Sequence, residues 1–433
     1  MKKIAACIVT YNRDKAVEET CLKLLGSLDE RYLDLYVYDS SDNYRTQVVI
    51  ENYTKTYKNL FYCHMDSNIH SSQKVYQIYQ EKKMQEQYAY LWILPDYLAF
   101  SEEVMEQCLE KIDEEYDMIM LDFYDYQNRG NLEYTDKNKI FLNYAWALTQ
   151  YGILMLNCNS VLKNCAWSYL SKKYLQPNYR NFSHVTMYFE QMLQIKDFRF
   201  YHISVPMRLV YYSSHKGKTR YFHEFLDIWG DYWPKSMYAL PAYYKEKERA
   251  IKNLSTYTGY LGKTDLLELR VNKVLTKKMF FRLVKHWKII SSASVGTFFY
   301  ITFLPMCLIK GSIKVEHLKN QIKASYREVE LTCFCRKFKE IYIYGAGVRA
   351  ERCAEYLDRC HIEYQAFLVT HLQKETEIKG HKVLEFSKEI PFNYAGIIVA
   401  VSEKYQKEII PLLEENGFGK RIFTKNMIVR GKT

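Results

Sequence analysis

The sequence predicts an α/β protein with two sheet domains that are joined by a basic and apolar region. Two observations indicate this fold class. In about the first 110 residues, apolar strand-like segments alternate with segments of helical spacing, which is typical of a parallel, open sheet. From Lys339 onward the same alternation returns, beginning with a strand, a glycine turn and a helix.

The length and composition fit this division. A chain of 433 residues is too long for one ordinary core, so two or three domains are expected. The composition of 48% hydrophobic and 26% charged residues is typical of a globular protein. We expect domains at residues 1–265, 266–335 and 336–433. The 41 tyrosines fit either ordinary half-buried positions or stacking on sugar rings and bases.

The net charge indicates the class of partner, and the cysteine content indicates the redox compartment. The formal net charge of +11 favours an anionic partner, which leaves nucleic acid, an anionic membrane or a phosphorylated substrate. The 11 cysteines form no framework, and the C-x-C pair Cys333 and Cys335 has no second pair or His cluster at zinc spacing. Met1 leads directly into a strand-like segment without a secretory signal, so we expect a reducing, cytoplasmic setting.

Polar residues follow the strands predicted in the N-terminal part. We expect strands at residues 4–9, 33–39, 60–63 and 88–96, and helices at 14–25 and from about Ser72. Ligands of parallel sheets bind at the carboxyl ends of the strands. The chain places Tyr11 and Asn12, Asp39 to Asp42, and Asp96 at these ends. This convergence predicts a binding site there.

The region 266–335 has a different character. Five cations interleave with apolar residues at helical spacing, which predicts a basic amphipathic helix that either lies on a membrane surface or packs with a solvated basic face. These cations are Lys277, Lys278, Arg282, Lys285 and Lys288. Residues 289–309 carry no charge, and their number is near the roughly 20 needed to span a bilayer, but serines, Gly296 and Pro305 favour shallow or re-entrant insertion. More positive charge follows at Lys310, Lys314, Lys319 and Lys323.

The C-terminal domain has a glycine turn between its first strand and helix. Gly345, Gly347 and Ala350 form G-x-G-x-x-A, which is typical of a phosphate cradle. The acidic residue that NAD binding requires about 20 positions later is absent, since Thr370 and His371 stand there. This domain resembles the Rossmann-like domains of bacterial polysaccharide-synthesis proteins, in which such a turn binds a nucleotide or only packs closely. Both roles stay open for Gly345 and Gly347.

Three segments of the N-terminal part resemble glycosyltransferase family two. They are IVTYNR on the first strand, YDSSDN after the second, and YLWILPD on a later strand. The resemblance covers about the first 110 residues and implies a GT-A fold and sugar transfer from a nucleotide-sugar.

The resemblance also implies roles for individual residues. Asp39 would accept a hydrogen bond from the base imide, and Asn68 matches an Asn of the donor loop. The other expected nucleotide contacts are Thr10, Tyr11, Asn12, Arg13 and Ser41. The family's third motif carries two or three carboxylates for a divalent metal, Mn²⁺ or Mg²⁺, but here only Asp96 is present. Asp96 therefore holds a metal alone, or cationic side chains replace the metal, or Asp96 is a turn residue.

An inverting transferase needs a base for the acceptor hydroxyl. The segment NFSHVTMYFEQML matches the region that supplies this base in the family, and it offers His184 and Glu190. A structural histidine and a solvated helix face are the alternative interpretations of these two residues.

These observations predict a bacterial glycosyltransferase that is peripheral on the inner face of the cell membrane. Its donor would be a nucleotide-sugar, of the UDP class by the resemblance, and its acceptor a cell-surface glycan or polyprenyl-linked molecule. Nucleic acid is not an expected partner, and self-association into a homo-oligomer stays open. The alternative is a non-catalytic nucleotide-sugar-binding or scaffold protein. A third interpretation, an NAD-dependent dehydrogenase, rests on the C-terminal glycines alone.

Overall fold

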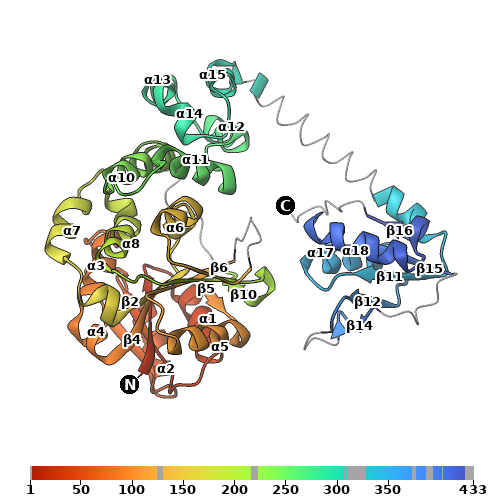
Figure 1. Cartoon of the computed structure of the whole chain (residues 1–433), viewed down its shortest axis with the longest axis horizontal. Helices are drawn as coiled ribbons and strands as arrows, with labels where there is room; N and C mark the ends of the chain where they lie inside the picture. The colour runs from red at the N-terminus through yellow and green to blue at the C-terminus, as the bar shows by residue number, and fades with distance from the viewer. Residues whose placement is uncertain are drawn as a thin grey trace. The chain divides into compact units, whose positions relative to one another are not determined.

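The structure is a computed structural model that describes residues 2–123, 130–215, 223–306, 308–309, 328–372, 377–386, 394–401 and 403–424 (Figure 1). The chain divides into two compact units. Unit 1 is Met1–Met306 and unit 2 is Cys307–Thr433. Each unit is described by itself.

Unit 1 is built on an eight-stranded sheet with the order β3-β2-β1-β4-β8-β6-β9-β7. Strands β3, β2, β1 and β4 are parallel, as the alternation of strands and helices predicts. The sheet then becomes mixed, because β8 runs antiparallel to both β4 and β6. The strands are β1 Lys2–Thr10, β2 Leu33–Asp39, β3 Leu60–His64, β4 Tyr88–Pro95, β6 Met118–Asp122, β7 Leu132–Tyr134, β8 Leu154–Asn157 and β9 Phe200–Ser204.

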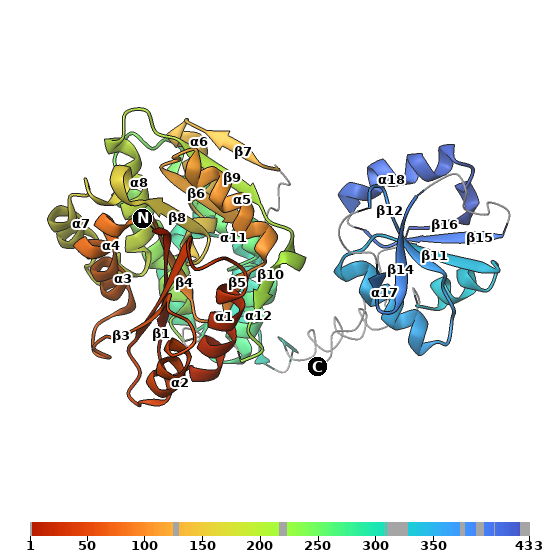
Figure 2. The same ribbon diagram turned by 90° about the horizontal axis from the view of Figure 1, so that it is seen from below.

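Helices flank the parallel half of this sheet (Figure 2). Helix α1 buries Val17, Cys21 and Leu24, the residues whose spacing predicts it. Every residue of β2 is buried, which is typical of a strand covered on both faces. The helices of this half are α1 Asp14–Leu25, α2 Arg45–Thr54, α3 Ser71–Gln80, α4 Lys82–Gln87 and α5 Glu102–Asp113.

A two-stranded ribbon and further helices complete unit 1. Strand β5, Leu98–Phe100, pairs antiparallel with β10, Val210–Tyr212. The helices are α6 Lys137–Tyr144, α7 Trp167–Tyr174, α8 Ser183–Gln194, α9 Phe225–Asp227, α10 Trp233–Ala239, α11 Lys247–Thr258, α12 Lys263–Val271, α13 Lys277–Leu283, α14 Trp287–Ile290 and α15 Val295–Phe303. Shorter helical turns lie at Ala147–Thr149, Cys158–Leu162, Arg180–Phe182, Met207–Leu209, Ile228–Tyr232 and Val284–His286.

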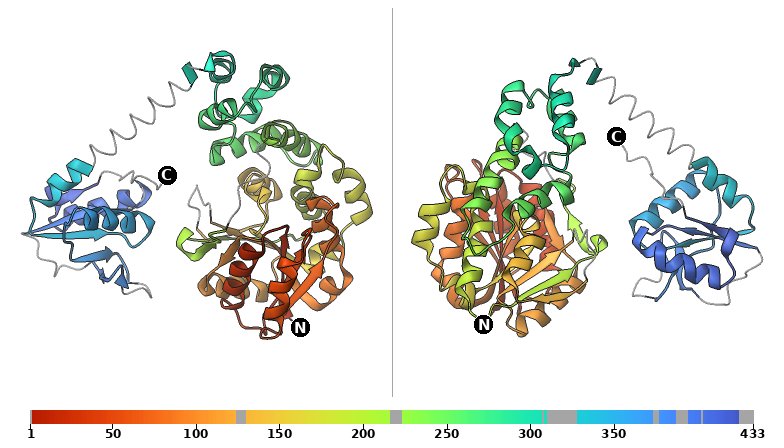
Figure 3. Two further views of the ribbon diagram at one scale, coloured as in Figure 1. Left: turned by 180° about the vertical axis from the view of Figure 1, so that it is seen from behind. Right: turned by 45° about the horizontal axis from the view of Figure 1, so that its top comes forward.

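The basic segment is part of unit 1 and forms short helices instead of one long helix. Figure 3 shows α12 to α15, in green to teal, gathered beside α11. The predicted apolar face is buried, since Phe280, Leu283 and Trp287 are at most 5% exposed. Trp287 stacks on Phe298 of α15 with ring centroids 3.6 Å apart. Among the described residues, no helix is both long enough and apolar enough to cross a membrane. The four lysines expected beyond it, at 310, 314, 319 and 323, lie outside the described residues.

Unit 2 is a smaller α/β domain, as predicted. Its six-stranded sheet has the order β13-β14-β12-β11-β15-β16, and all neighbours are parallel except β13 and β14. The elements are β11 Glu340–Tyr344, α17 Val348–Arg359, β12 Ala366–Val369, β13 Glu377–Ile378, β14 His381–Glu385, β15 Ala395–Val399, α18 Glu403–Glu415, a helical turn Gly419–Arg421 and β16 Ile422–Phe423.

The side chains of β11 alternate between two cores. Ile341 and Ile343 pack with residues of α17 such as Leu357. Tyr344 faces the other way and packs with residues of α18 such as Leu413. This alternation follows from the period of two in a strand, and it places α17 and α18 on opposite faces of the sheet (Figure 2).

Candidate functional site

The ends of the parallel strands of unit 1 lie level with one another. Thr10 of β1 pairs with Asp39 of β2, and Val9 pairs with Pro95 of β4. The residues that follow these strands therefore meet at one edge of the sheet. This is the edge at which the strand order predicts a binding site.

The loops after β1 and β2 are joined by hydrogen bonds. Asn12 adopts a left-handed backbone conformation with φ of 54°, which Asn tolerates better than most residues. Its backbone N–H donates to Ser41 Oγ at 2.7 Å, and its side-chain oxygen accepts from Asn43 Nδ2 at 2.8 Å. Tyr11 donates its hydroxyl hydrogen to Asp42. The structure thus brings Tyr11, Asn12 and Ser41 together, as the sequence predicts.

Asp39 is buried beneath these loops, with 1% of its surface exposed. Its Oδ1 accepts from the Ser41 N–H at 2.9 Å and from the Ser41 hydroxyl, and its Oδ2 accepts from the Tyr62 hydroxyl at 3.1 Å. A carboxylate offers about four lone-pair sites, so one further donor can still bind Asp39. Burial raises the pKa of the Tyr62 phenol above its usual value, and the nearby Asp39 carboxylate raises it further.

A buried cation lies near Asp39. Lys74, in the first turn of α3, is 5% exposed. Burial lowers the pKa of its ammonium, while the negative charges of Asp66, Asp39 and Asp42 act in the opposite direction. Among the described residues, none forms a hydrogen bond with the Lys74 ammonium.

Asp96, which follows β4, is bound to two residues of the β1 loop. Thr10 Oγ1 donates to Asp96 Oδ2 at 2.9 Å, and Arg13 Nη1 forms an ion pair with Asp96 Oδ1 at 3.1 Å. The Asp96 side chain is 6% exposed and that of Arg13 is 30% exposed. Burial raises the pKa of the Asp96 carboxyl, and Arg13 opposes this shift. Thr10, Arg13 and Asp96 thus form one cluster, although Asp96 is far from the other two in the sequence.

Asn68 forms its hydrogen bonds within its own loop. It is exposed, and both its N–H and its Nδ2 donate to Asp66 Oδ1, at 2.9 and 3.0 Å. His70 then caps α3 by accepting from the Ser72 N–H at 3.2 Å. Burial lowers the pKa of His70 to about 4, so this cap stays uncharged near neutral pH.

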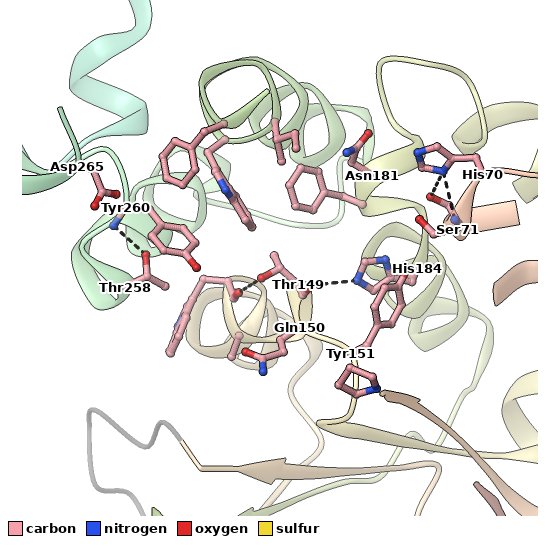
Figure 4. A pocket seen from close by; sticks show the side chains of 18 of the residues that line it. His70, Ser71, Thr149, Gln150, Tyr151, Asn181, His184, Thr258, Tyr260 and Asp265 are labelled. Carbon is pink, nitrogen blue, oxygen red and sulfur yellow. Dashed lines mark hydrogen bonds between the residues drawn. The ribbon is translucent and has the colours of Figure 1, made fainter. Parts of the chain in front are cut away.

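A cavity of about 570 Å³ opens next to the cluster, since Pro95 and Tyr97, the two neighbours of Asp96, are part of its wall (Figure 4). The wall also includes residues of the 147–151 turn, the start of α8, helix α9, the turn Ile228–Tyr232, the end of α11 and helix α12. Asp265 and Tyr260 lie at one end of the cavity, and His70 and Ser71 at the other. Its aromatic wall residues are Tyr97, Trp146, Tyr151, Phe182, Phe225, Trp229 and Tyr260. Such a wall suits the apolar faces of sugar rings.

His184 is part of this wall, at the start of α8. It is 2% exposed, and its ring lies against Tyr151 with centroids 4.3 Å apart. Its Nε2 is 3.3 Å from the Thr149 carbonyl oxygen, while its buried Nδ1 has no partner among the described residues. A carbonyl only accepts, so Nε2 carries the hydrogen and Nδ1 keeps a lone pair. Burial lowers the pKa of His184 to about 4.

Glu190, the other predicted base, has a different environment. Its Oε1 accepts from Lys173 Nζ at 2.8 Å and from the Tyr174 hydroxyl. It is 6% exposed and is not among the residues that line the cavity. The two candidates on α8 are thus in separate places, and His184 is the one beside the cavity.

Comparison with known sequences identifies this part of the chain. Residues 5–176 match the sequence family described as glycosyl transferase family 2. These residues are a glycosyltransferase family 2 domain. The match confirms the resemblance and the predicted GT-A domain, and it covers the Thr10–Arg13 loop, Asp39 and Asp96. Comparison with curated proteins gives no match.

Solved structures also resemble the chain at low identity. TarS of S. aureus has 13% identity and a TM-score of 0.37, and the match covers 67% of this chain and 50% of TarS. TarS 1-349 in complex with UDP-GlcNAc has 12% identity and a TM-score of 0.39 over 67% of this chain and 84% of that one. The mannosyltransferase PcManGT of Pyrobaculum calidifontis, in complex with GDP-Man and Mn²⁺, has 11% identity and a TM-score of 0.39 over 72% and 80%. None of these likenesses bears on the donor, acceptor or metal of this chain.

The sequence does not indicate several of the residues in the cavity wall of unit 1. Tyr97, Gln150, Trp229 and Asp265 come from four separate segments, and no local motif marks them. The abundance of tyrosine is the one signal that points to an aromatic cavity. Asp265 accepts from the Leu261 N–H at 3.1 Å, and burial raises the pKa of its carboxyl.

A metal is not well accommodated by the residues at the third motif of the family 2 domain. Asp96 already pairs with the Arg13 guanidinium, whose positive charge opposes a cation at the same carboxylate. Among the described parts of the chain, no three His, Cys, Asp or Glu side chains are grouped so that they could hold a metal ion. Hard cations usually need several such oxygen ligands. We therefore derive no step through a metal.

In unit 2, the two glycines of the predicted cradle have different surroundings. Gly345 has φ of 121°, and a Cβ there would lie 2.8 Å from Val401 and 3.1 Å from the Ala400 carbonyl oxygen. Close packing of two turns therefore requires Gly345. A Cβ at Gly347 would meet nothing within 4 Å, so this glycine borders open space at the start of α17.

Proposed function

We propose that unit 1 transfers a sugar from a nucleotide-sugar, a UDP-sugar by the resemblance, to a hydroxyl group of an acceptor. One observation carries this proposal: the strand-end loops of a family 2 domain lie beside an aromatic cavity whose wall begins at the two neighbours of Asp96. The nucleotide would lie on the loops and the transferred sugar would extend into the cavity.

Asp39 would bind the base. A uracil ring presents an imide N–H, which needs an acceptor, and Asp39 retains room for one more donor beside Ser41 and Tyr62. Because Asp39 is buried, its hydrogen bond to the base would be worth more than an exposed one. The Ser41–Asn12 contact would hold the two loops at the spacing that the base requires.

His184 would act as the general base. The neutral His184 ring is part of the cavity wall, and its Nδ1 keeps a lone pair but is buried without a partner among the described residues, so binding of the acceptor would have to uncover this nitrogen. Nδ1 takes the proton of the acceptor hydroxyl as its oxygen bonds to the anomeric carbon of the donor. The bond between that carbon and the diphosphate oxygen breaks, and the nucleoside diphosphate leaves. A single displacement of this kind inverts the anomeric configuration.

The acceptor would be a cell-surface glycan or a polyprenyl-linked sugar at the cytoplasmic face of the membrane. The part of the cavity near Tyr260 and Trp229 offers aromatic faces for a sugar ring, and Asp265 and Glu268 offer hydrogen-bond acceptors for its hydroxyls. This wall belongs to the same helical part of unit 1 as α13 to α15, so the acceptor would bind in the part of the unit that docks on the membrane.

The α13–α15 surface would dock the protein on an anionic membrane. This surface consists of the aromatic residues Phe281, Phe299 and Tyr300, which are 65%, 54% and 58% exposed, and the exposed cations Lys277, Lys278, Lys285 and Lys288. A surface with both exposed aromatic side chains and cations suits the membrane interface, where apolar lipid chains meet negatively charged headgroups. The charge of the surface is what favours a lipid partner over an apolar protein partner.

Binding and turnover together test the proposed function. We expect Asp39→Asn to weaken UDP binding about tenfold to a hundredfold, because it places an amide where the imide N–H needs a charged acceptor. Tyr62→Phe is the matched control: it removes one contact of the same carboxylate and should leave UDP affinity within about threefold of wild type. Isothermal titration calorimetry measures both.

Turnover separates an enzyme from a scaffold. A panel of UDP-sugars is incubated with the protein and glycan acceptors, and release of UDP is followed. UDP release that depends on an acceptor supports the transferase. UDP binding without release from any donor would support the alternative, a nucleotide-sugar-binding scaffold, and Asp39→Asn binding UDP like the wild type would contradict the base contact.

A further inference from the structure

The ion pair between Arg13 and Asp96 alters the chemistry of the donor site. Asp96 stands where the family resemblance implies a metal-binding carboxylate. Instead of an open carboxylate, the position holds one whose two oxygens accept from Thr10 and from Arg13, at 2.9 and 3.1 Å. The residues on either side of it, Pro95 and Tyr97, add no carboxylate.

Arg13 has hydrogen-bond donors to spare. A guanidinium carries five N–H donors, and a single Arg13 nitrogen, Nη1, is engaged with Asp96. The side chain is 30% exposed and belongs to the loop that begins at Thr10, so its remaining donors are open at the strand-end edge. Guanidinium groups bind phosphate oxygens in a bidentate way, and Asp96 would keep this one oriented.

A second cation is available at the same edge. Lys74 is 5% exposed and lies within electrostatic reach of Asp39, the proposed base contact. Its ammonium has no hydrogen-bond partner among the described residues, so its three donors can bind a ligand.

We propose that the donor diphosphate is bound by Arg13, with Lys74 as a second cation, in place of a divalent metal. This inference rests on the proposed function, because it assigns the groups that neutralise the leaving diphosphate of that reaction. As the bond between the anomeric carbon and the diphosphate oxygen breaks, the new negative charge is met by N–H donors that are already in place. Asp96 is a positioning residue, since it acts through Arg13.

Calorimetry of the full-length protein tests this with UDP, in EDTA and in Mn²⁺. We expect wild-type UDP affinity to agree within about twofold in the two buffers, and Arg13→Gln to weaken it about tenfold or more in both. Arg13→Lys should recover part of the lost UDP affinity, because lysine keeps the positive charge but lacks the bidentate geometry of the guanidinium. The matched control is Arg31→Gln, an exposed arginine that pairs with Asp29 before β2, and it should bind UDP like the wild type.

Two results would overturn the proposal: UDP binding that Mn²⁺ tightens tenfold or more, or Arg13→Gln that folds and binds UDP like the wild type. Asp96→Asn gives an independent readout. We expect Asp96→Asn to weaken UDP binding to the same extent in EDTA and in Mn²⁺, because Arg13 loses the carboxylate that orients it, whereas the loss of a metal ligand would weaken UDP binding in Mn²⁺ alone. Uridine, followed by ligand-observed NMR, should bind wild type and Arg13→Gln alike. If uridine and UDP both fail to bind the wild type, the proposed function itself fails.

Discussion

At the scale of single residues, burial and one backbone contact determine the chemistry of His184. The Thr149 carbonyl selects the tautomer with hydrogen on Nε2, and burial keeps the ring neutral. Glu190, six positions later on the same helix, has its charge compensated by Lys173. His184 lines the cavity and Glu190 does not, so its position, and not its basicity, favours His184 as the proton acceptor.

The lowered pKa of His184 predicts a pH-dependent stability. The folded-state value is about 4 and the ordinary value is 6.5, so the unfolded chain binds this proton at higher pH. Stability from the neutral ring is fully present above 6.5 and is lost as the pH falls to about 4, on the order of 3 kcal/mol in total. The difference in unfolding free energy between wild type and His184→Gln should therefore shrink as the pH falls. Urea denaturation from about pH 7 to about pH 4.5 measures it.

His70, whose pKa is also about 4, is present in both proteins and cancels in this difference. The same variant should lower kcat about a hundredfold to ten-thousandfold, while UDP affinity stays near wild type. Glu190→Gln is the matched control and should keep turnover within severalfold. Two results would contradict these roles of His184. One is a difference in unfolding free energy between wild type and His184→Gln that does not change with pH, and the other is equal turnover by the two proteins.

At the scale of elements, α13 to α15 divide their residues between core and surface. Phe280, Trp287 and Phe298 are buried and their rings contact one another, whereas Phe281 and Phe299 on the same helices are more than half exposed. The buried set explains the helical spacing of the apolar residues in the sequence. The exposed set is more than packing requires, which is why we propose it as the membrane-docking surface.

We expect the protein to float with vesicles that contain phosphatidylglycerol and to be released in part by high salt. The charges contribute on the order of 1 kcal/mol each and are screened, whereas apolar insertion is not. Replacing Phe281, Phe299 and Tyr300 together with Ser should abolish the salt-resistant fraction. Tyr169→Ser, at a 51% exposed position on α7, is the control. Flotation that is equal on neutral vesicles, or absent altogether, would refute the docking surface.

At the scale of the whole molecule, the chain separates into unit 1 and unit 2, each with its own sheet. The strand-end loops, Asp96, the cavity and His184 all belong to unit 1. Unit 2 contributes a glycine turn in which Gly345 packs against Val401 and Gly347 borders open space. Donor binding should therefore depend on unit 1 alone.

Residues 1–306, produced by themselves, should unfold cooperatively and bind UDP within about threefold of the full chain, because every proposed donor contact lies inside them. Differential scanning calorimetry and titration calorimetry measure the two properties. Residues 328–433 serve as the comparison and should bind neither UDP nor NAD tightly. NAD binding is not expected because Thr370 and His371 stand where an acidic ribose contact would be. UDP binding that is lost in 1–306 would show that unit 2 takes part in the donor site.

The sequence by itself determines the elements of this protein and the positions of its motifs. Apolar runs and helical spacing predict β1 to β4, α1 and the strand–turn–helix at Gly345, and all of these are present. They are predictable because strand and helix periods are local properties of a few neighbouring residues. The likeness of residues 5–176 to family 2 follows from motifs at the ends of such strands. The solitary carboxylate at Asp96 is also visible in the sequence.

Only the tertiary structure decides what those residues contact. The partner of Asp96 is Arg13, 83 positions away, and the cavity joins segments from His70 to Leu269. The antiparallel β8 beside β4, and the separation of His184 from Glu190, are likewise results of packing. No short-range pattern records such contacts, because they depend on which buried surfaces meet when distant segments pack together.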